Sequence, residues 1–407
     1  MKRRDVLAFA GASVVSGCHL PLTMEQGLMN PCRTSIPASA NALMQQAWSG
    51  LDADRVWDVH THLFGNGRSG GGIWVEPDYD RPSSVMGRVR HAFFKNAGCA
   101  GDNDDQLDQG MVARLVALAD QYPKGARFML LAFDFTVDDG GVKREDLTTF
   151  SVPNAYARRI AQMRPDRFEW IASIHPSRSD AVPMLEEAKA QGARAVKWLP
   201  PTMGIDLRSP GALAFYEALA RLDVPLLVHL GEEQAVAGAR RHELANPLFI
   251  RVALERGVRV IAAHCASLGK SPDLEANPNA DKAPMVANFD LFARLMSDKR
   301  YDGRLFGDIS AITQVNRAEH LAKLLSMRAW DGRLLNGSDY PLPGLMPLFS
   351  LARMVSDGLL DERLVPALRD LREANALLFD FTLKRNLKSQ GTGFPLSTFE
   401  TRDFFRG

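Results

Sequence analysis

From residue 55 onward, short runs rich in β-branched and other apolar residues alternate with helical patterns. Eight of these runs are typical of strands, at residues 55–63, 127–135, 169–175, 193–199, 224–230, 258–266, 304–310 and 333–340. Such alternation is typical of βα units around a parallel sheet. Eight strands favour a closed α/β fold, a (β/α)8 TIM barrel, over an open doubly wound sheet.

The barrel is expected to span residues 51–385 as one domain. Its longest connection, residues 64–126, follows the first strand, contains a GNGRSGGG cluster and predicts an elaborated loop. Loops that follow barrel strands surround the active-site mouth, so this loop should shape the substrate site. Residues 386–407 form a C-terminal tail whose phenylalanines should pack on the barrel or at a subunit interface.

The N-terminus has the order of an export signal. Three basic residues precede an uncharged stretch, residues 6–17, which is too short to cross a bilayer as a helix. The arginine pair resembles a twin-arginine signal, and Val-Ser-Gly before Cys18 resembles a lipoprotein cleavage site. We therefore predict a signal peptide at 1–17, lipidation of Cys18 and a proline-containing tether over 18–50.

This leader predicts an exported protein, in the bacterial periplasm or anchored to the membrane through its lipid alone. The alternative is an exposed basic N-terminal helix on a cytoplasmic protein. The formal charge is +1, from 49 Lys and Arg against 48 Asp and Glu, and no basic stripe is present, which argues against nucleic-acid binding. The expected partner is a small-molecule substrate, with homo-oligomerisation left open.

The cysteines are few for a chain of this length. Cys18, Cys32, Cys99 and Cys265 are too scattered to predict a disulfide framework or a CxxC metal site. With Cys18 assigned to lipidation, the other three need not pair. Cys265 follows His264 on a strand and should point to the opposite face, as a buried inert thiol.

Ligand-type side chains recur where the predicted strands end. His60 and His62 are two residues apart and share one face of the first strand. An isolated HxH pair is weak evidence, because such histidines can simply be hydrogen-bonded at a strand end. The repetition is more informative: the other strand ends with ligand-type residues are Lys197, His229, His264 and Asp339. Six such residues from five strands would converge at one mouth of the barrel and bind a divalent metal.

With these residues the chain resembles the amidohydrolase superfamily of metal-dependent hydrolases. The resemblance covers most of residues 55–385. It is carried by DVHTH at 58–62, VKWLPP at 196–201, VPLLVHLGE at 224–232, VIAAHC at 260–265, NGSDYP at 336–341 and NALLFD at 375–380. The last two are similar to the amidohydrolase-related branch, which includes hydrolases, decarboxylases and hydratases that act on carboxylated substrates.

The resemblance implies metal ligation by His60, His62, His229, His264 and Asp339. In two-metal members the lysine that matches Lys197 is carboxylated and bridges both ions, whereas single-metal members need no such bridge. An unmodified ammonium would be repelled by a dication, so Lys197 should be carboxylated, deprotonated or turned toward a substrate anion. Its amine could instead simply reach solvent.

Imidazoles and a carboxylate suit Zn²⁺, as one or two ions, with Mn²⁺ or Fe²⁺ as other occupants. Such a metal makes hydroxide available near neutral pH. Asp339 could accept a proton and pass it to the leaving group. Asp339 and Lys197 are therefore the predicted catalytic residues.

Three further side chains lie near the predicted mouth. His175 ends the third strand and Glu232 follows His229, so both are candidates for substrate binding, although a hydrogen-bonded strand end and a solvated loop explain them equally well. Asp308, on the seventh strand, could line the pocket, but neither chemistry nor resemblance assigns it a ligand role.

The predicted function is hydrolysis of an amide, lactone or related carbonyl bond of a small molecule. A metal-dependent lyase on the same scaffold, a non-oxidative decarboxylase or hydratase, is the alternative. An alternative of another class is a non-catalytic ligand-binding lipoprotein.

Overall fold

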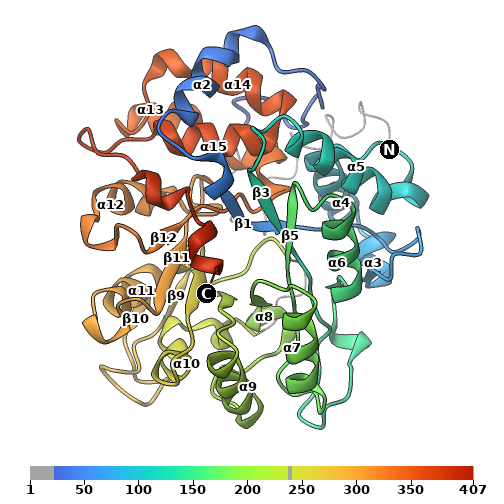
Figure 1. Ribbon diagram of the computed structural model, residues 1–407, viewed down its shortest axis with the longest axis vertical. Coiled ribbons are helices and arrows are strands. Elements are labelled where there is room, and N and C mark those ends of the chain that lie inside the picture. The colour runs from blue at the N-terminus through green and yellow to red at the C-terminus, as the bar shows by residue number, and fades with distance from the viewer. Residues whose placement is uncertain (1–22, 237–240, 407) are drawn as a thin grey trace.

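The computed structural model describes residues 23–236 and 241–406 as an α/β fold built on parallel strands (Figure 1). One parallel sheet has three strands in the order β1-β3-β5, and a second has five in the order β12-β11-β8-β7-β6. Their bounds are Trp57–His62 (β1), Arg127–Leu131 (β3), Phe168–Ile171 (β5), Val196–Trp198 (β6), Leu226–His229 (β7), Val260–Ala263 (β8), Leu305–Asp308 (β11) and Leu334–Leu335 (β12). Each lies in one of the eight predicted runs, except that β5 begins one residue earlier, at Phe168, so the strand predictions are confirmed.

Hydrogen bonds connect the two sheets at both edges. A parallel bridge pairs Thr61, on β1, with Tyr340, just beyond β12. A second parallel bridge pairs Ala172, just beyond β5, with Val196 on β6. The eight strands therefore follow one another in the order that a (β/α)8 barrel requires.

Side chains that alternate along the strands fill the space between them. Trp57 and Val59 on β1, Met129 and Leu131 on β3, and Ile171 on β5 belong to one buried apolar cluster. Residues of opposite parity, such as Phe128 and Leu130, belong to a separate cluster toward the helices. The register of β1 against β3 shifts between Asp58 and Thr61, so this alternation does not by itself set the direction of His60.

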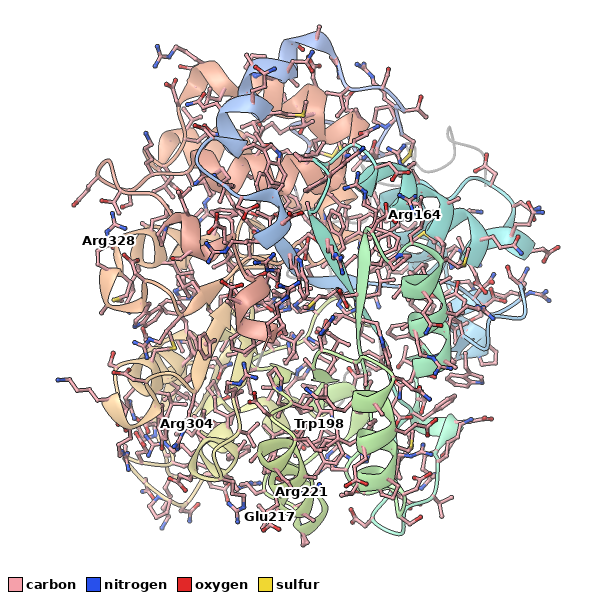
Figure 2. The ribbon with its side chains drawn as sticks, in the orientation of Figure 1. Arg164, Trp198, Glu217, Arg221, Arg304 and Arg328 are labelled. Atoms are coloured by element: carbon pink, nitrogen blue, oxygen red, sulfur yellow. A yellow bond between two sulfur atoms is a disulfide. The ribbon has the colours of Figure 1, made fainter. Side chains whose placement is uncertain are left out.

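Helices surround the strands. Those that follow β3 are α6 Asn154–Met163, α7 Ala181–Ala190, α8 Pro200–Met203, α9 Pro210–Arg221, α10 Arg251–Glu255, α11 Asn288–Met296, α12 Leu321–Ser326, α13 Leu351–Ser356, α14 Val365–Ala374 and α15 Ala376–Asn386. The chain leaves α7 through Gly192, whose φ of 90° favours glycine, as is common just beyond a helix C-terminus. The fully buried Trp198 lies within this shell, and the exposed Arg328 lies at the edge of the molecule (Figure 2).

The prediction of a tether over 18–50 is wrong for residues 23–50. They include the helix α2 Asn41–Trp48, in which Leu43 and Ala47 are buried. Trp48 stacks on Phe381 of α15 with a centroid distance of 4.5 Å. Apolar residues spaced along this segment bury against the C-terminal helices, so the segment belongs to the folded body.

The C-terminal tail packs against the parallel strands, which agrees with one of its two expected roles. Phe405 joins the cluster inside the ring of strands and stacks near Trp57, at 6.5 Å between ring centroids. Thr401 donates a hydrogen bond from its hydroxyl to the carbonyl oxygen of Trp57 at the start of β1. The tail therefore covers the end of the ring opposite the strand carboxyl termini.

The long connection after β1 carries structure of its own, as predicted for an elaborated loop. It contains β2 Trp74–Val75, α3 Pro77–Asp80, α4 Val85–Ala97 and α5 Leu107–Ala119. β2 pairs antiparallel with β4 Phe150–Ser151. Ser84 caps α4 by accepting a hydrogen bond from the amide of Gly87, which fixes where that helix begins.

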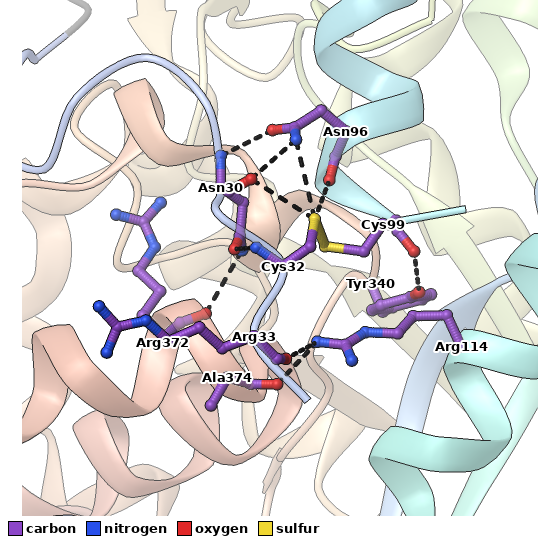
Figure 3. The surroundings of a disulfide bond; sticks show 10 residues. Asn30, Cys32, Arg33, Asn96, Cys99, Arg114, Tyr340, Arg372 and Ala374 are labelled. Carbon is purple, nitrogen blue, oxygen red and sulfur yellow. Dashed lines mark hydrogen bonds between the residues drawn. A yellow bond between two sulfur atoms is a disulfide. The ribbon is translucent and has the colours of Figure 1, made fainter. Parts of the chain in front are cut away.

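A disulfide joins Cys32 to Cys99, just beyond α4, and corrects the expectation that these cysteines need not pair (Figure 3). Asn30 and Asn96 reinforce it through two hydrogen bonds: the amide of Asn30 donates to Asn96 Oδ1 at 2.7 Å, and Asn96 Nδ2 donates to the carbonyl of Asn30 at 2.9 Å. The end of α4 is thus anchored to the N-terminal segment. Cys265 is a buried free thiol, as predicted.

Removal of this bond should destabilise the protein. The two cysteines are 67 residues apart, so the bond closes a long loop in the unfolded chain, for which loop entropy predicts about 4 kcal/mol. We expect a Cys32→Ser, Cys99→Ser variant to lose about 2–4 kcal/mol of unfolding free energy, measured by urea denaturation. Reductant should destabilise the parent to the same extent and leave the variant unchanged; equal stability of the parent with and without reductant contradicts the prediction.

None of the described helices is long and apolar enough to span a membrane. The predicted signal peptide at 1–17 and the predicted lipidation site Cys18 lie outside the described residues.

Candidate metal centre

The six predicted ligand-type side chains line one cavity at the carboxyl ends of the strands. They are His60 and His62 on β1, Lys197 on β6, His229 at the end of β7, His264 directly after β8 and Asp339 beyond β12. The cavity has a volume of about 250 Å³. All parallel strands end at the same side, which is why residues far apart in sequence meet there.

Three of them form a compact donor set. One ligand atom each from His60, His264 and Asp339 lies within 4.8 Å of the others, and all three residues are buried. Asp339 Oδ1 is 3.2 Å from His62 Nε2 and 3.5 Å from His60 Nε2. Two imidazoles and a carboxylate converging on one point are the donors that Zn²⁺ and similar divalent metals take. The donor set therefore fits a divalent metal.

The backbone at two of these donors is strained. His264 and Asp339 have φ values of 55° and 59°, in the left-handed region that non-glycine residues rarely adopt. Hydrogen bonds hold both conformations: the amide of His264 donates to Asp308 Oδ1 at 2.9 Å, and that of Asp339 donates to the carbonyl of His60 at 2.8 Å. Backbone strain that the surroundings maintain is typical of functional sites.

A glycine permits the close approach of the loop that carries Asp339. A Cβ atom at Gly337 would lie 2.6 Å from Cβ of His60, nearer than real Cβ atoms come to other atoms. Lys384, on α15, donates a hydrogen bond to the carbonyl of Gly337 at 2.7 Å and another to Asp380 at 2.6 Å. Loop and helix therefore fix Asp339 against β1.

Asp308 organises the histidines, a role that the sequence did not reveal. Its Oδ2 lies 2.8 Å from His60 Nδ1, and its Oδ1 accepts the backbone amides of His264 and Ser310. A carboxylate on Nδ1 places the proton there and leaves His60 Nε2 free to ligate. The signal available in sequence was its place at a strand end, the same position as the predicted ligands.

His229 and His264 are oriented in a similar way. His229 Nδ1 is 3.3 Å from Oε2 of the buried Glu233, and His229 Nε2 is 3.3 Å from the carbonyl oxygen of Glu232. His264 Nδ1 is 2.8 Å from the Ser310 hydroxyl. The ring of His264 is thus held through Nδ1, which reduces the reorganisation needed to bind a metal, whereas both ring nitrogens of His229 lie beside acceptors of the protein.

Burial sets the protonation of these groups. It lowers the pKa of His229 to about 4, and it lowers the pKa of His264 well below the usual value. Burial alone would raise the pKa of Asp339, but the neighbouring His264 and the other imidazoles hold it well below its usual range. Neutral imidazoles beside a carboxylate are the protonation states that metal binding requires.

Lys197 lies inside this group. Its Nζ is 3.4 Å from His60 Nε2, and its side chain is buried. Burial lowers the pKa of Lys197 to about 8, although Asp308 and Asp339 oppose the shift. The amine therefore does not reach solvent, as one alternative had it, and a substantial neutral fraction is available near pH 8.

The two predicted substrate-binding residues lie elsewhere. His175 does not line the cavity: its Nε2 is 3.1 Å from the carbonyl of Met203 and its Nδ1 accepts the amide of Ser177. The side chain of Glu232 accepts a hydrogen bond from Gln234 and does not line the cavity either, whereas Glu233 does. Backbone groups lie within hydrogen-bond distance of both ring nitrogens of His175. The alternative that His175 is simply a hydrogen-bonded polar residue therefore describes it better than a role in substrate binding.

His175 should make stability depend on pH. Burial lowers the pKa of His175 to about 4, below its usual 6.5, so the unfolded chain takes up a proton first as pH falls. Stability is retained above pH 6.5 and falls progressively between pH 6.5 and 4, by about 3 kcal/mol from this residue. Urea denaturation at several pH values in this window should show that the unfolding free energy falls less steeply with decreasing pH for His175→Gln than for the parent. The same pH dependence of the unfolding free energy in the two proteins would contradict the prediction.

Comparison with known families supports the geometry. The model of the amidohydrolase family Amidohydro_2 matches residues 57–362, from the first strand to beyond Asp339. The chain belongs to this amidohydrolase family. A search of curated proteins found no significant match.

Several solved structures are similar to this amidohydrolase. An uncharacterised TIM-barrel protein from Bordetella bronchiseptica is 15% identical, with 78% of this chain and 99% of that one covered and a TM-score of 0.47. A probable 2-pyrone-4,6-dicarboxylic acid hydrolase from Acinetobacter baumannii is 14% identical over 80% and 97% of the chains, with a TM-score of 0.42. The 5-carboxyvanillate decarboxylase from Novosphingobium aromaticivorans, complexed with manganese, is 13% identical over 96% and 100%, with a TM-score of 0.45.

Proposed function

We propose that this amidohydrolase is a metal-dependent hydrolase on a (β/α)8 barrel, which cleaves an amide, lactone or related carbonyl bond of a small molecule. The observation that carries the proposal is the buried set of His60, His264 and Asp339, with ligand atoms within 4.8 Å of one another. His62 and His229 complete the proposed ligands. Zn²⁺ is the proposed ion, because imidazole and carboxylate donors suit it best.

A bound divalent metal would supply Lewis acidity, polarising the substrate carbonyl and lowering the pKa of water at the site. Asp339 Oδ1, which faces His60 and His62, would accept the proton of the attacking water and return it to the leaving group. Asp308 would keep Nδ1 of His60 protonated, so that Nε2 faces the reacting groups. The cavity itself would exclude bulk water around the substrate carbonyl.

Lys197 has a chemical role open to it in this hydrolase. Its neutral amine could attack CO₂, forming an N–C bond and releasing one proton to water, and the resulting carbamate could bridge two ions. The lowered pKa of Lys197, about 8 through burial, favours the neutral amine that this reaction needs. We propose two states of the site. In one, a single metal is bound and Lys197 is unmodified; in the other, two metals are bound and Lys197 is carboxylated.

Metal stoichiometry combined with the mass of the Lys197 peptide tests this proposal. Two ions per chain together with the added mass of one CO₂ would support the bridged site, and one ion with an unmodified lysine the single-metal site. Turnover on a panel of amides and lactones should disappear on chelation and return with Zn²⁺. Ligand binding without turnover across the panel would support the non-catalytic lipoprotein instead.

A lyase is the second candidate, and Arg317 favours it. Arg317 is 5% exposed and lines the cavity, with one Nη donating to Ser267 at 3.2 Å. A guanidinium on the wall could hold a substrate carboxylate beside the metal set. Product analysis separates the reactions: CO₂ released without incorporation of ¹⁸O from labelled water indicates decarboxylation, whereas ¹⁸O in a carboxylic acid product indicates hydrolysis.

We also propose that the enzyme is exported and anchored through Cys18. The Cys32–Cys99 disulfide supports export, because disulfides persist in oxidising compartments and are rare in the cytosol. The mass of the mature N-terminal peptide tests the anchor: acylated Cys18 supports it, and an intact residue 1–17 segment contradicts it.

A further inference from the structure

The outer half of the cavity differs in character from its floor. The floor is formed by histidines, Lys197 and Asp339, whereas the wall above it is largely apolar. The apolar residues on one side, from the long loop after β1, are Phe64, Tyr79, Met86, Val89, Phe93 and Phe94. Two polar residues, Arg90 and Thr149, line the cavity together with these apolar residues.

Helix α4 presents this wall from a fixed position. Its C-terminal end is anchored by the Cys32–Cys99 disulfide and by Asn96. A Cβ atom at Gly344 would lie 2.1 Å from the carbonyl oxygen of Ala97, so this end of α4 also lies directly against the turn that follows Asp339. The same turn region contributes Leu342, Leu345 and Leu348 to the lining of the cavity. Apolar side chains from two adjoining segments therefore line the same cavity as the metal set.

The apolar side chains of α4 are incompletely covered by the protein. Met86 is 49% exposed, and Val89 and Phe93 are half-buried. Phe64 supports the helix from beneath, stacked with Phe94 at 6.0 Å and edge-on to Tyr79 at 6.1 Å between ring centroids. Contiguous apolar surface that stays exposed within a built cavity is typical of a ligand site.

We propose that this wall is a subsite for an apolar acyl or aryl group of the substrate, whose carbonyl then reaches Asp339 and the metal set. The proposal rests on the proposed hydrolase function and specifies its substrate class. Continuity with the metal centre identifies the occupant, because α4 residues and the six floor residues line the same cavity. A substrate that is polar throughout would leave Val89 and Phe93 in water.

Hydroxamic acids that share one metal-binding group test the subsite without requiring turnover. Acetohydroxamate, benzohydroxamate and octanohydroxamate would be titrated into the zinc-loaded protein by calorimetry. We expect the two apolar probes to bind about tenfold or more tighter than acetohydroxamate, because each buried methylene contributes about fourfold in affinity. Equal affinities for the three probes would overturn the subsite. If no probe binds, including acetohydroxamate, the metal site itself fails and both proposals fall.

A matched pair of valines on α4 tests whether the tighter binding of the apolar probes depends on the side of the helix that lines the cavity. Val89 lines the cavity, whereas Val85, one helical turn earlier, is 42% exposed and does not line it. Val89→Asn should reduce the advantage of benzohydroxamate by about fivefold and leave acetohydroxamate binding unchanged, while Val85→Asn should change neither. Phe93→Ser should act as Val89→Asn does. If Val89→Asn instead changes only the oligomeric state in sedimentation velocity, the wall is a self-association surface and the proposal is overturned.

Discussion

Replacement of Asp339 by asparagine is expected to lower kcat/KM for the hydrolysed substrate by about 10²–10⁴-fold. The carboxylate is buried and faces the imidazoles of His60 and His62, at 3.5 and 3.2 Å from their Nε2 atoms. An asparagine amide has similar size but can neither accept the proton of the attacking water nor carry the negative charge that a metal favours. Steady-state kinetics on the active substrate of the panel measures the loss.

Two measurements separate loss of chemistry from loss of structure in this variant. Metal content shows whether the remaining ligands still hold the ion, and circular dichroism shows whether the fold is retained. Asp357→Asn serves as the matched control, because Asp357 is an exposed aspartate beside Arg353 and does not line the cavity. Activity within a few-fold of the parent in folded, metal-containing Asp339→Asn protein would exclude Asp339 as the proton acceptor.

Simultaneous replacement of His60 and His264 by alanine is expected to abolish metal binding and, with it, turnover. The two rings stack at 5.0 Å between centroids and supply two of the three donors of the compact set. Loss of even an outer partner of a ligand costs about 10–100-fold in metal affinity, so loss of two ligands should exceed 100-fold. Elemental analysis after dialysis against limiting Zn²⁺ measures the effect.

His91→Ala is the control for the histidine variant. His91 lies on α4, its Nδ1 is 3.2 Å from the carbonyl of Tyr79, and it does not line the cavity. It should keep the metal content of the parent. Parental metal content in the folded double variant would show that the metal is bound elsewhere and would remove the basis of the proposed function.

The sequence predicted the strands and the convergence of six side chains on one cavity, because both follow from short-range periodicity. The carboxyl ends of parallel strands all lie at the same edge of the sheet, so a residue at such an end lies at that edge whichever strands are its neighbours. Asp308 occupies such an end, yet its role could not be predicted. That role depends on His60, which lies 248 positions away and only 2.8 Å distant in space.

The N-terminal segment also makes contacts that could not be predicted from the sequence. Its prolines and weak periodicity favoured a tether, but α2 buries Leu43 and Ala47 against the body, and Cys32 pairs with Cys99. Neither cysteine carries a local signal of pairing, because a disulfide needs two thiols to meet in space, and sequence spacing does not show this. Spacing was equally uninformative for His175, which lies four residues beyond the end of β5 and whose ring nitrogen contacts the carbonyl oxygen of Met203.

By itself, therefore, the sequence determined which strands form, which side chains lie at their carboxyl ends, and the amidohydrolase character of those ends, since these depend on residues a few positions apart. The tertiary structure alone decided which donors approach within 4.8 Å, that Asp308 orients His60, that Lys197 is buried beside it, and that α4 places an apolar wall over the centre. These features depend on distances between strands and loops remote in sequence, which only the packed chain defines.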